Sequence, residues 1–178
     1  MAGANGVSRG ANGVSGTRYG PRDGPNRTED GLHMGTKWSL TIDCAQPARL
    51  AAFWALALGY TEKPAPAGFG SWEEWFAHHG VPEDEWDQGA YLSDPDGEGP
   101  GLSFQQVPEP KAAKNRLHLD VRAGGGRDTP WEERWPRVVE AMERLIAAGA
   151  TVVHEEALGG RPDHLVMADP EGNEFCLL

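Results

Sequence analysis

The sequence predicts an α+β fold of two paired βαβββ modules that form a curled sheet around a central cleft. The order strand, helix, strand, strand, turn, strand is found twice after residue 37. The turns begin at Asp94 (Asp-Pro-Asp-Gly) and Asp169 (Asp-Pro-Glu-Gly), 53 positions after Thr41 and 51 positions after His118. Similar intervals indicate a duplicated unit. Because neither unit alone can bury both faces of a curled sheet, we expect them to pair, with polar side chains meeting in the cleft.

The first unit begins with a strand at residues 38–44, where apolar and polar side chains alternate. One face is apolar and expected to be buried, and the other is polar (Trp38, Leu40, Ile42 and Cys44 against Ser39, Thr41 and Asp43). Pro47 suits the first turn of a helix, and its apolar residues recur at helical spacing up to Gly59, a typical helix stop. Three more strands are expected, at residues 60–63, 89–92 and 101–107.

Residues 64–88 interrupt this pattern between the second and third strands. Ser71 and Glu74 have the spacing of a capping box, which predicts a short helix. Trp72 and Trp75 lie on this helix and are candidates for contact with an aromatic ligand. The segment is interpreted either as a lid over a pocket or as a cover for an edge of the sheet.

The second unit begins with residues 115–121, which alternate in the same way. The side chains expected on the buried face are Leu117, Leu119 and Val121, and those on the other face are Arg116, His118 and Asp120. His118 is either a structural histidine satisfied by a neighbour or a group that lines a cavity. In an enclosed site, the nearby carboxylate of Asp120 would favour the imidazolium form and support acid–base chemistry.

The second helix follows a glycine-rich link. Thr129 and Glu132 have capping-box spacing, with Pro130 at the first helical position. Pro136 falls early in this run, so the regular helix has an alternative start there. The expected apolar stripe is Val138, Met142, Leu145 and Ile146, and strands are expected at residues 150–154, 164–168 and 174–178.

The net charge of −11 argues against nucleic acid or an anionic membrane as a partner, because phosphates would be repelled. There is no run of about 18 apolar residues and no visible secretory signal. Cys44 and Cys176 are too few for a disulfide framework, so we expect reduced, buried thiols in a cytoplasmic protein. Residues 1–36 are of low complexity and are expected to be a disordered tail or an artefact of start-site choice, with Met34 as the alternative start.

Three segments carry a family resemblance: residues 50–59 (LAAFWALALG), 107–120 (VPEPKAAKNRLHLD) and 169–176 (DPEGNEFC). With them the chain resembles the vicinal oxygen chelate superfamily of glyoxalases, bleomycin-resistance proteins and extradiol dioxygenases, and within it the glyoxalase-like domain proteins. The resemblance implies one domain over residues 37–178, with modules at about 37–108 and 114–178. It also implies a small-molecule ligand in a U-shaped cavity and a homodimer.

The metal enzymes of this superfamily take their ligands from the first and last strands of each module. The resemblance places His118 at such a position, which makes it the candidate ligand for a divalent metal. The matching positions elsewhere hold Ser39 or Thr41, Gln105 or Ser103, and Cys176 in place of the usual glutamate, with Glu174 two residues earlier. A catalytic zinc ion takes three protein ligands and hard divalent ions commonly take carboxylates, so this set would be unusual.

Two functions of different classes follow from the resemblance. The first is an enzyme of the lyase, isomerase or dioxygenase type, in which His118 acts as a base or a lone metal ligand and Asp120 orients it. The second is a non-catalytic protein that sequesters a drug or metabolite, as bleomycin-resistance proteins do. The candidate ligand-binding residues are Ser39, Thr41, Gln105, Trp72 and Trp75.

Overall fold

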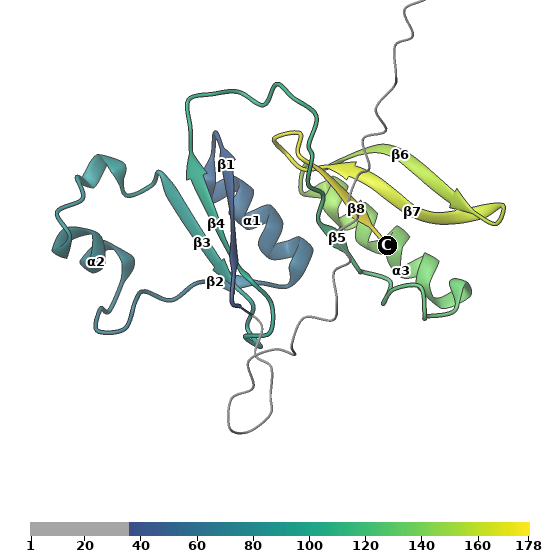
Figure 1. Cartoon of the computed structure of the whole chain (residues 1–178), viewed down its shortest axis with the longest axis horizontal. Coiled ribbons are helices and arrows are strands. Elements are labelled where there is room, and N and C mark those ends of the chain that lie inside the picture. Colours follow the sequence, from purple (N-terminus) through teal and green to yellow (C-terminus); the bar gives the residue numbers. More distant parts are fainter. Residues whose placement is uncertain (1–35) are drawn as a thin grey trace, which may run out of the picture. The chain divides into compact units, whose positions relative to one another are not determined.

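Each half of the chain forms a four-stranded mixed sheet with a helix packed against it (Figure 1). The structure is a computed structural model, and it describes residues 36–178. A tail was expected at residues 1–36, and residues 1–35 of it lie outside the described residues. The predicted α+β fold of two βαβββ modules is confirmed.

The two modules have the same connectivity. The first contains β1 (Ser39–Cys44), α1 (Pro47–Leu58), β2 (Thr61–Glu62), α2 (Trp72–His78), a 3-10 helix (Glu83–Glu85), β3 (Gly89–Ser93) and β4 (Gly101–Gln106). The second contains β5 (Asp120–Val121), α3 (Trp131–Ala147), β6 (Thr151–Leu158), β7 (Arg161–Ala168) and β8 (Glu174–Leu177). The sheet orders are β1-β4-β3-β2 and β5-β8-β7-β6, with the first strand of each module parallel to its last.

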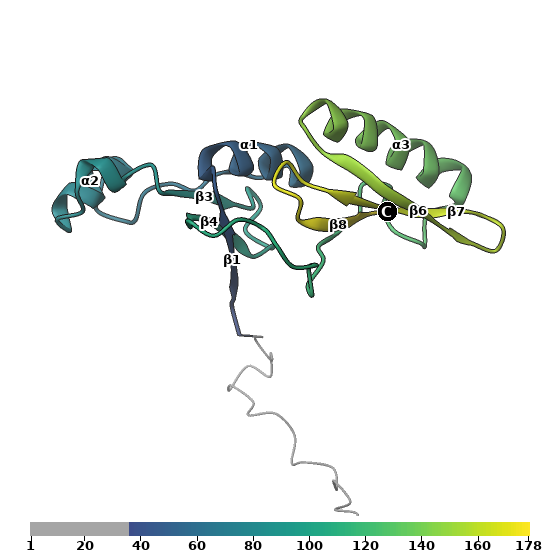
Figure 2. The ribbon, with the colours of Figure 1, turned by 90° about the horizontal axis from the view of Figure 1, so that it is seen from above.

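Figure 2 shows α1 along one face of the first sheet and α3 along one face of the second. Within residues 36–178, none of the helices combines the length and apolar character needed to cross a membrane.

One apolar core serves both modules. Phe53 and Trp54 of α1 are 3% and 1% exposed, and Phe175 of β8 is fully buried beside them. The rings of Trp54 and Phe175 meet edge to face, with their centroids 5.3 Å apart. Because α1 belongs to the first module and β8 to the second, burial of these rings couples the folding of the two halves.

The strand expected at residues 115–121 is mostly absent. Only its last two residues pair with β8, and Leu117, expected on the buried face, is 80% exposed. Residues 115–117 have no strand beside them, because the register places Glu174, the first residue of β8, opposite His118. There the backbone N–H of Glu174 donates to the side chain of Asn115 (3.2 Å). The segment before β5 is therefore a mostly exposed connection rather than a strand.

Helix α3 begins earlier than Pro136 and is not capped by Thr129. Its N-cap is Pro130, with no side-chain hydrogen bond, and the helix runs through Pro136. Tertiary contacts hold the first turn: the indole N–H of Trp131 donates to a backbone carbonyl of β7 (2.7 Å). Such contacts offset the hydrogen bond that Pro136 cannot donate, which is why the helix does not start at the proline.

Three more side chains are less buried than the sequence pattern predicts. Trp38 is 64% exposed because it precedes the first paired residue of β1, and Ile146 is 44% exposed. On α3 the buried stripe instead passes through Val138, Ala141 and Leu145. Both cysteines are free, but Cys176 is only partly buried.

A buried ion pair ties α3 to β7. Arg134 and Asp163 are each 5% exposed, and Arg134 donates to both the carboxylate (3.1 Å) and the backbone carbonyl (2.6 Å) of Asp163. Arg127 donates to the other carboxylate oxygen at 2.6 Å, and Nδ1 of His164 lies 3.0 Å from it. The hydrogen bond from Arg127 is the main cause of the lowered pKa of Asp163, and burial opposes it. The carboxylate is thus fully partnered inside the protein.

Candidate functional site

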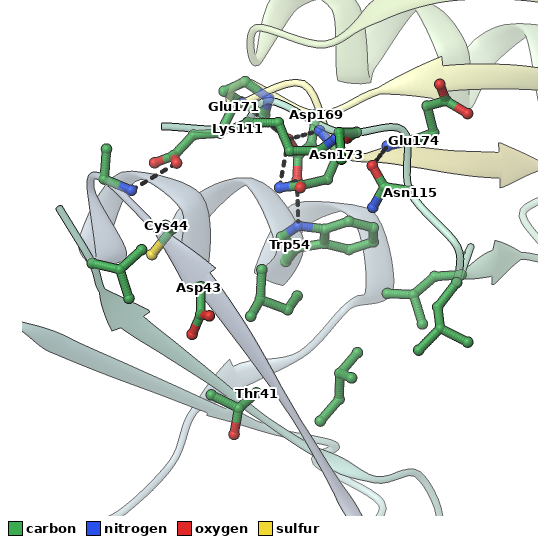
Figure 3. Close-up of a pocket in the computed structure, with 18 of the residues that line it drawn as sticks. Thr41, Asp43, Cys44, Trp54, Lys111, Asn115, Asp169, Glu171, Asn173 and Glu174 are labelled. Atoms are coloured by element: carbon green, nitrogen blue, oxygen red, sulfur yellow. Dashed lines mark hydrogen bonds between the residues drawn. The ribbon is translucent and has the colours of Figure 1, made fainter. Parts of the chain in front are cut away.

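A cleft of about 1160 Å³ lies where the two modules meet. Its walls come from β1, the connection at residues 107–119 and the turn between β7 and β8 (Figure 3). Its apolar side chains include Leu40, Ile42, Trp54, Leu117 and Leu119, and its polar ones include Thr41, Asp43, Lys111, Asn115, His118 and Glu174. An apolar surface with a few polar groups is typical of small-molecule sites.

Asp169 holds the turn between β7 and β8 in place. Its carboxylate accepts the backbone N–H groups of Glu171 and Asn173, both at 2.9 Å. It also accepts the indole N–H of Trp54 at 3.2 Å, a bond drawn in Figure 3. The sequence identifies Asp169 as a turn former, and the structure adds that it fixes the turn against α1. This contact joins the two modules at the cleft, because the turn and α1 belong to different modules.

Glu171, in the same turn, caps the start of α1. Its two carboxylate oxygens accept the backbone N–H groups of Ala45 (2.7 Å) and Gln46 (2.8 Å). A carboxylate at a helix N-terminus is also favoured by the helix dipole. Burial, and then the charge of Glu171, raise the pKa of Cys44 to about 11. The Cys44 thiol is therefore protonated at neutral pH and is a core group, not a nucleophile.

His118 lines the cleft and contacts a carboxylate. Its Nε2 lies 3.3 Å from Oε2 of Glu174, and its Nδ1 lies 3.9 Å from Sγ of Cys176. The sequence pairs His118 with Asp120, but in the structure the histidine contacts Glu174, and Asp120 is in register with Cys176. An imidazole beside a carboxylate is an arrangement that can hold and transfer a proton.

Lys114 completes this group by forming an ion pair with Glu174. The hydrogen bond from Lys114 is the main cause of the lowered pKa of Glu174, and the charges of His118 and Lys111 add to it against the effect of burial. Burial, followed by the charge of Asp120, raises the pKa of Cys176. The thiol therefore stays protonated beside an ionised Glu174, and it is not an activated nucleophile.

The first module contributes fewer of the expected residues. Thr41 lines the cleft together with Asp43, and both are labelled in Figure 3. Among the described residues, Ser39 and Gln105 are not part of the cleft lining, although Gln105 is the register partner of Asp43 in the neighbouring strand. The structure thus brings together Thr41 and His118, but not Ser39 and Gln105.

Trp72 and Trp75 lie on α2 and pack within their own module. The ring of Trp72 stacks on Tyr91 of β3, with centroids 4.4 Å apart, and its indole N–H donates to the carbonyl of Lys63 (2.7 Å). Trp75 meets Trp72 edge to face at 5.7 Å. No residue of α2 is buried. Neither indole belongs to the lining of the cleft in the part of the chain that the structure describes.

The donor set of the cleft does not fit a divalent metal ion. Within residues 36–178 no three His, Cys, Asp or Glu side chains are grouped so that they could hold one. His118 and Glu174 are two adjacent donors, but the ammonium of Lys114 already neutralises Glu174. The first module offers the hydroxyl of Thr41, and a zinc or hard-metal site needs more than this.

The fold and the site can be compared with known proteins. The family model described as "Glyoxalase-like domain" matches residues 39–178. No curated protein matches the chain. A mutant of the fosfomycin resistance protein FosX from Listeria monocytogenes, crystallised with Mn(II) and 1S,2S-dihydroxypropylphosphonic acid, is 13% identical with a TM-score of 0.52; the match covers 81% of this chain and 91% of that one.

Two further solved structures are similar. A protein from Agrobacterium tumefaciens, solved by solution NMR, is 13% identical with a TM-score of 0.50, covering 80% of this chain and 95% of that one. A glyoxalase/bleomycin resistance protein/dioxygenase family enzyme from Burkholderia phytofirmans is 17% identical with a TM-score of 0.48, covering 79% and 97%. At such identities the likeness concerns the fold. The match of the family model over residues 39–178 shows that the chain belongs to the glyoxalase-like domain family.

Proposed function

We propose that the protein binds a small organic molecule in the cleft between its modules and that binding needs no metal ion. The observation that carries the proposal is the cleft of about 1160 Å³. Two large apolar side chains of its lining are exposed to solvent, Leu117 to 80% and Trp38 to 64%. Ligand pockets usually measure about 300–1,000 Å³, so a drug-sized molecule has room here. A ligand that covers these side chains gains about 25 cal/mol per Å² of apolar surface removed from water.

The chemistry of the cleft favours binding over metal-dependent catalysis. Lyases and dioxygenases of the superfamily's metal-dependent type need a ligand set that His118 and Glu174 do not complete. The thiols of Cys44 and Cys176 have raised pKa values, which leaves no activated nucleophile among them. Sequestration of a drug or metabolite is therefore the function that these residues support best. The homodimer implied by the resemblance stays a prediction, which light scattering would test against a chain mass of 19.2 kDa.

Replacing Leu117 with aspartate is expected to weaken binding of an uncharged aromatic probe, naphthylmethanol, by about tenfold, because a buried leucine contributes about 1.5–3 kcal/mol. Titration calorimetry measures the affinity. Leu117 is mostly exposed in the free protein, so the fold should tolerate the change. The matched control is Leu158→Asp, because Leu158 is 63% exposed on β6 and lies outside the cleft. Equal affinities of the two variants for the probe would overturn the proposed site.

The contact between His118 and Glu174 supports a second candidate, metal-free acid–base catalysis of the lyase or isomerase type. In that case a bound ligand is converted by the wild-type protein, whereas His118→Gln binds it with similar affinity and converts it at least a hundredfold more slowly. Product analysis by mass spectrometry or NMR would measure this. If bound ligands stay unchanged on prolonged incubation with the wild-type protein, the catalytic candidate is contradicted and only the binding function remains.

A further inference from the structure

A group of basic side chains lies around the carboxylate of Glu174 at one wall of the cleft. Lys111 and Lys114 lie in the connection between the modules and, with His118, surround the carboxylate of Glu174. Lys114 and His118 contact this carboxylate directly. Within this group a single carboxylate faces two ammonium groups, so the group around Glu174 itself keeps a positive charge. A negatively charged ligand group would be attracted to it.

Asn115 adds a hydrogen-bond donor whose direction is fixed by the backbone. Its Oδ1 accepts the N–H of Glu174 at 3.2 Å, which identifies the oxygen end of the amide. The Nδ2 end then faces the other way, and Figure 3 shows it directed into the cleft. In the described part of the chain, Nδ2 has no acceptor. An oxygen atom of a ligand would supply the missing partner.

Among residues 36–178, the lining as a whole contains five carboxylates and three fixed cations, so the preference for an anion is confined to the group around Glu174. Asp169 and Glu171 keep their negative charge, but their oxygens are already bound by backbone N–H groups and by Trp54. Asp43, on β1, and Glu109 are the remaining carboxylates, and Arg49 is a further cation of the lining. The donors next to Glu174 are therefore the part of the cleft best suited to an anion.

We propose that the ligand of the cleft is an organic anion, a carboxylate with an apolar body. Its carboxylate accepts hydrogen bonds from Nδ2 of Asn115 and from the ammonium groups of Lys111 and Lys114. Its apolar body lies against Leu117 and Trp38, the exposed apolar side chains of the lining. This inference rests on the proposed binding function and specifies the class of molecule that is bound.

Three probes with the same apolar body and different charge test the inference: naphthoate, naphthylmethanol and naphthylmethylammonium. Titration calorimetry on the full chain at neutral pH and low salt compares their affinities. Naphthoate is expected to bind about tenfold more tightly than the alcohol, because hydrogen bonds to a charged group are the stronger ones. The ammonium probe is expected to bind more weakly than the alcohol.

Asn115→Asp gives the sharpest variant. An aspartate still accepts the N–H of Glu174, but it replaces the donor that faces the cleft with a negatively charged oxygen. The preference for naphthoate over the ammonium probe should fall at least tenfold and should reverse when Lys114→Met is added. The controls are Gln88→Glu and Lys63→Met, which change the net charge by the same amounts at exposed positions outside the cleft.

The outcomes separate the two proposals. If the alcohol binds in the cleft but naphthoate binds no more tightly, the anion inference is overturned and the binding function stands. If the control variants shift the preference as much as Asn115→Asp does, general electrostatics explain it, and the assigned donors are wrong. If none of the three probes binds, both proposals are overturned.

Discussion

Replacing Asp169 with alanine is expected to lower the free energy of unfolding by about 3–5 kcal/mol. Asp169 is 4% exposed, and its carboxylate accepts N–H groups from Glu171, Asn173 and Trp54. Alanine would leave these donors without an acceptor, and a buried unsatisfied donor costs about 1–3 kcal/mol. Urea unfolding followed by tryptophan fluorescence measures the loss.

The repeat supplies the control for this prediction. Asp94 occupies the same place in the turn of the first module and accepts the N–H groups of Asp96, Glu98 and Gly99. None of these donors belongs to the other module, and the Asp94 turn is more open to water. Asp94→Ala should therefore cost less than half as much as Asp169→Ala. Equal losses would mean that Asp169 acts only as a turn former and does not hold the modules together.

Replacing Asp163 with asparagine is expected to destabilise the protein by about 3–5 kcal/mol, because it leaves the buried guanidinium of Arg134 without a counter-charge. The change keeps the shape of the side chain, so the effect reports the charge. Glu133→Gln is the control: it removes an exposed ion pair with Arg137 on the same helix and should change stability little. Similar losses in the two variants would contradict a buried pair.

The same substitution should alter the dependence of stability on pH. Arg127 and Arg134 hold the pKa of Asp163 well below its usual range, so the folded protein favours the ionised carboxylate. The contribution of Asp163 is therefore complete above about pH 4, the unfolded value, and is lost as the pH falls through the lower folded pKa. Between about pH 5 and pH 2 the stability of the wild-type protein should fall more steeply than that of Asp163→Asn. Parallel curves from urea unfolding at a series of pH values would contradict the assignment.

The alternation and spacing of residues along the chain correctly predicted several elements. The strand at β1, helix α1 with its stop at Gly59, and the short helix capped by Ser71 all follow from such patterns, and all are found. Where the patterns were wrong, a distant partner decided the outcome. Leu117 alternates correctly but has no strand beside it, because β8 begins only at Glu174. Helix α3 continues through Pro136 because β7 holds its first turn.

For the site, the sequence predicted that His118 and either Ser39 or Thr41 would come from equivalent positions of a duplicated unit. The cleft contains His118 and Thr41, although His118 lies just before β5 and not in a strand. It could not show that Glu174 rather than Asp120 would contact His118, because a side-chain contact depends on strand register and on where the strand begins. Two contacts of the turn join residues that lie more than 100 positions apart, Asp169 with Trp54 and Glu171 with Ala45. No local sequence pattern connects such residues. Duplication and alternation are properties of the chain and can be read from it. The direction of Nδ2 in Asn115 and the pairing of Lys114 with Glu174 were decided only when the second module folded, because each depends on Glu174, which lies 59 and 60 positions further along the chain.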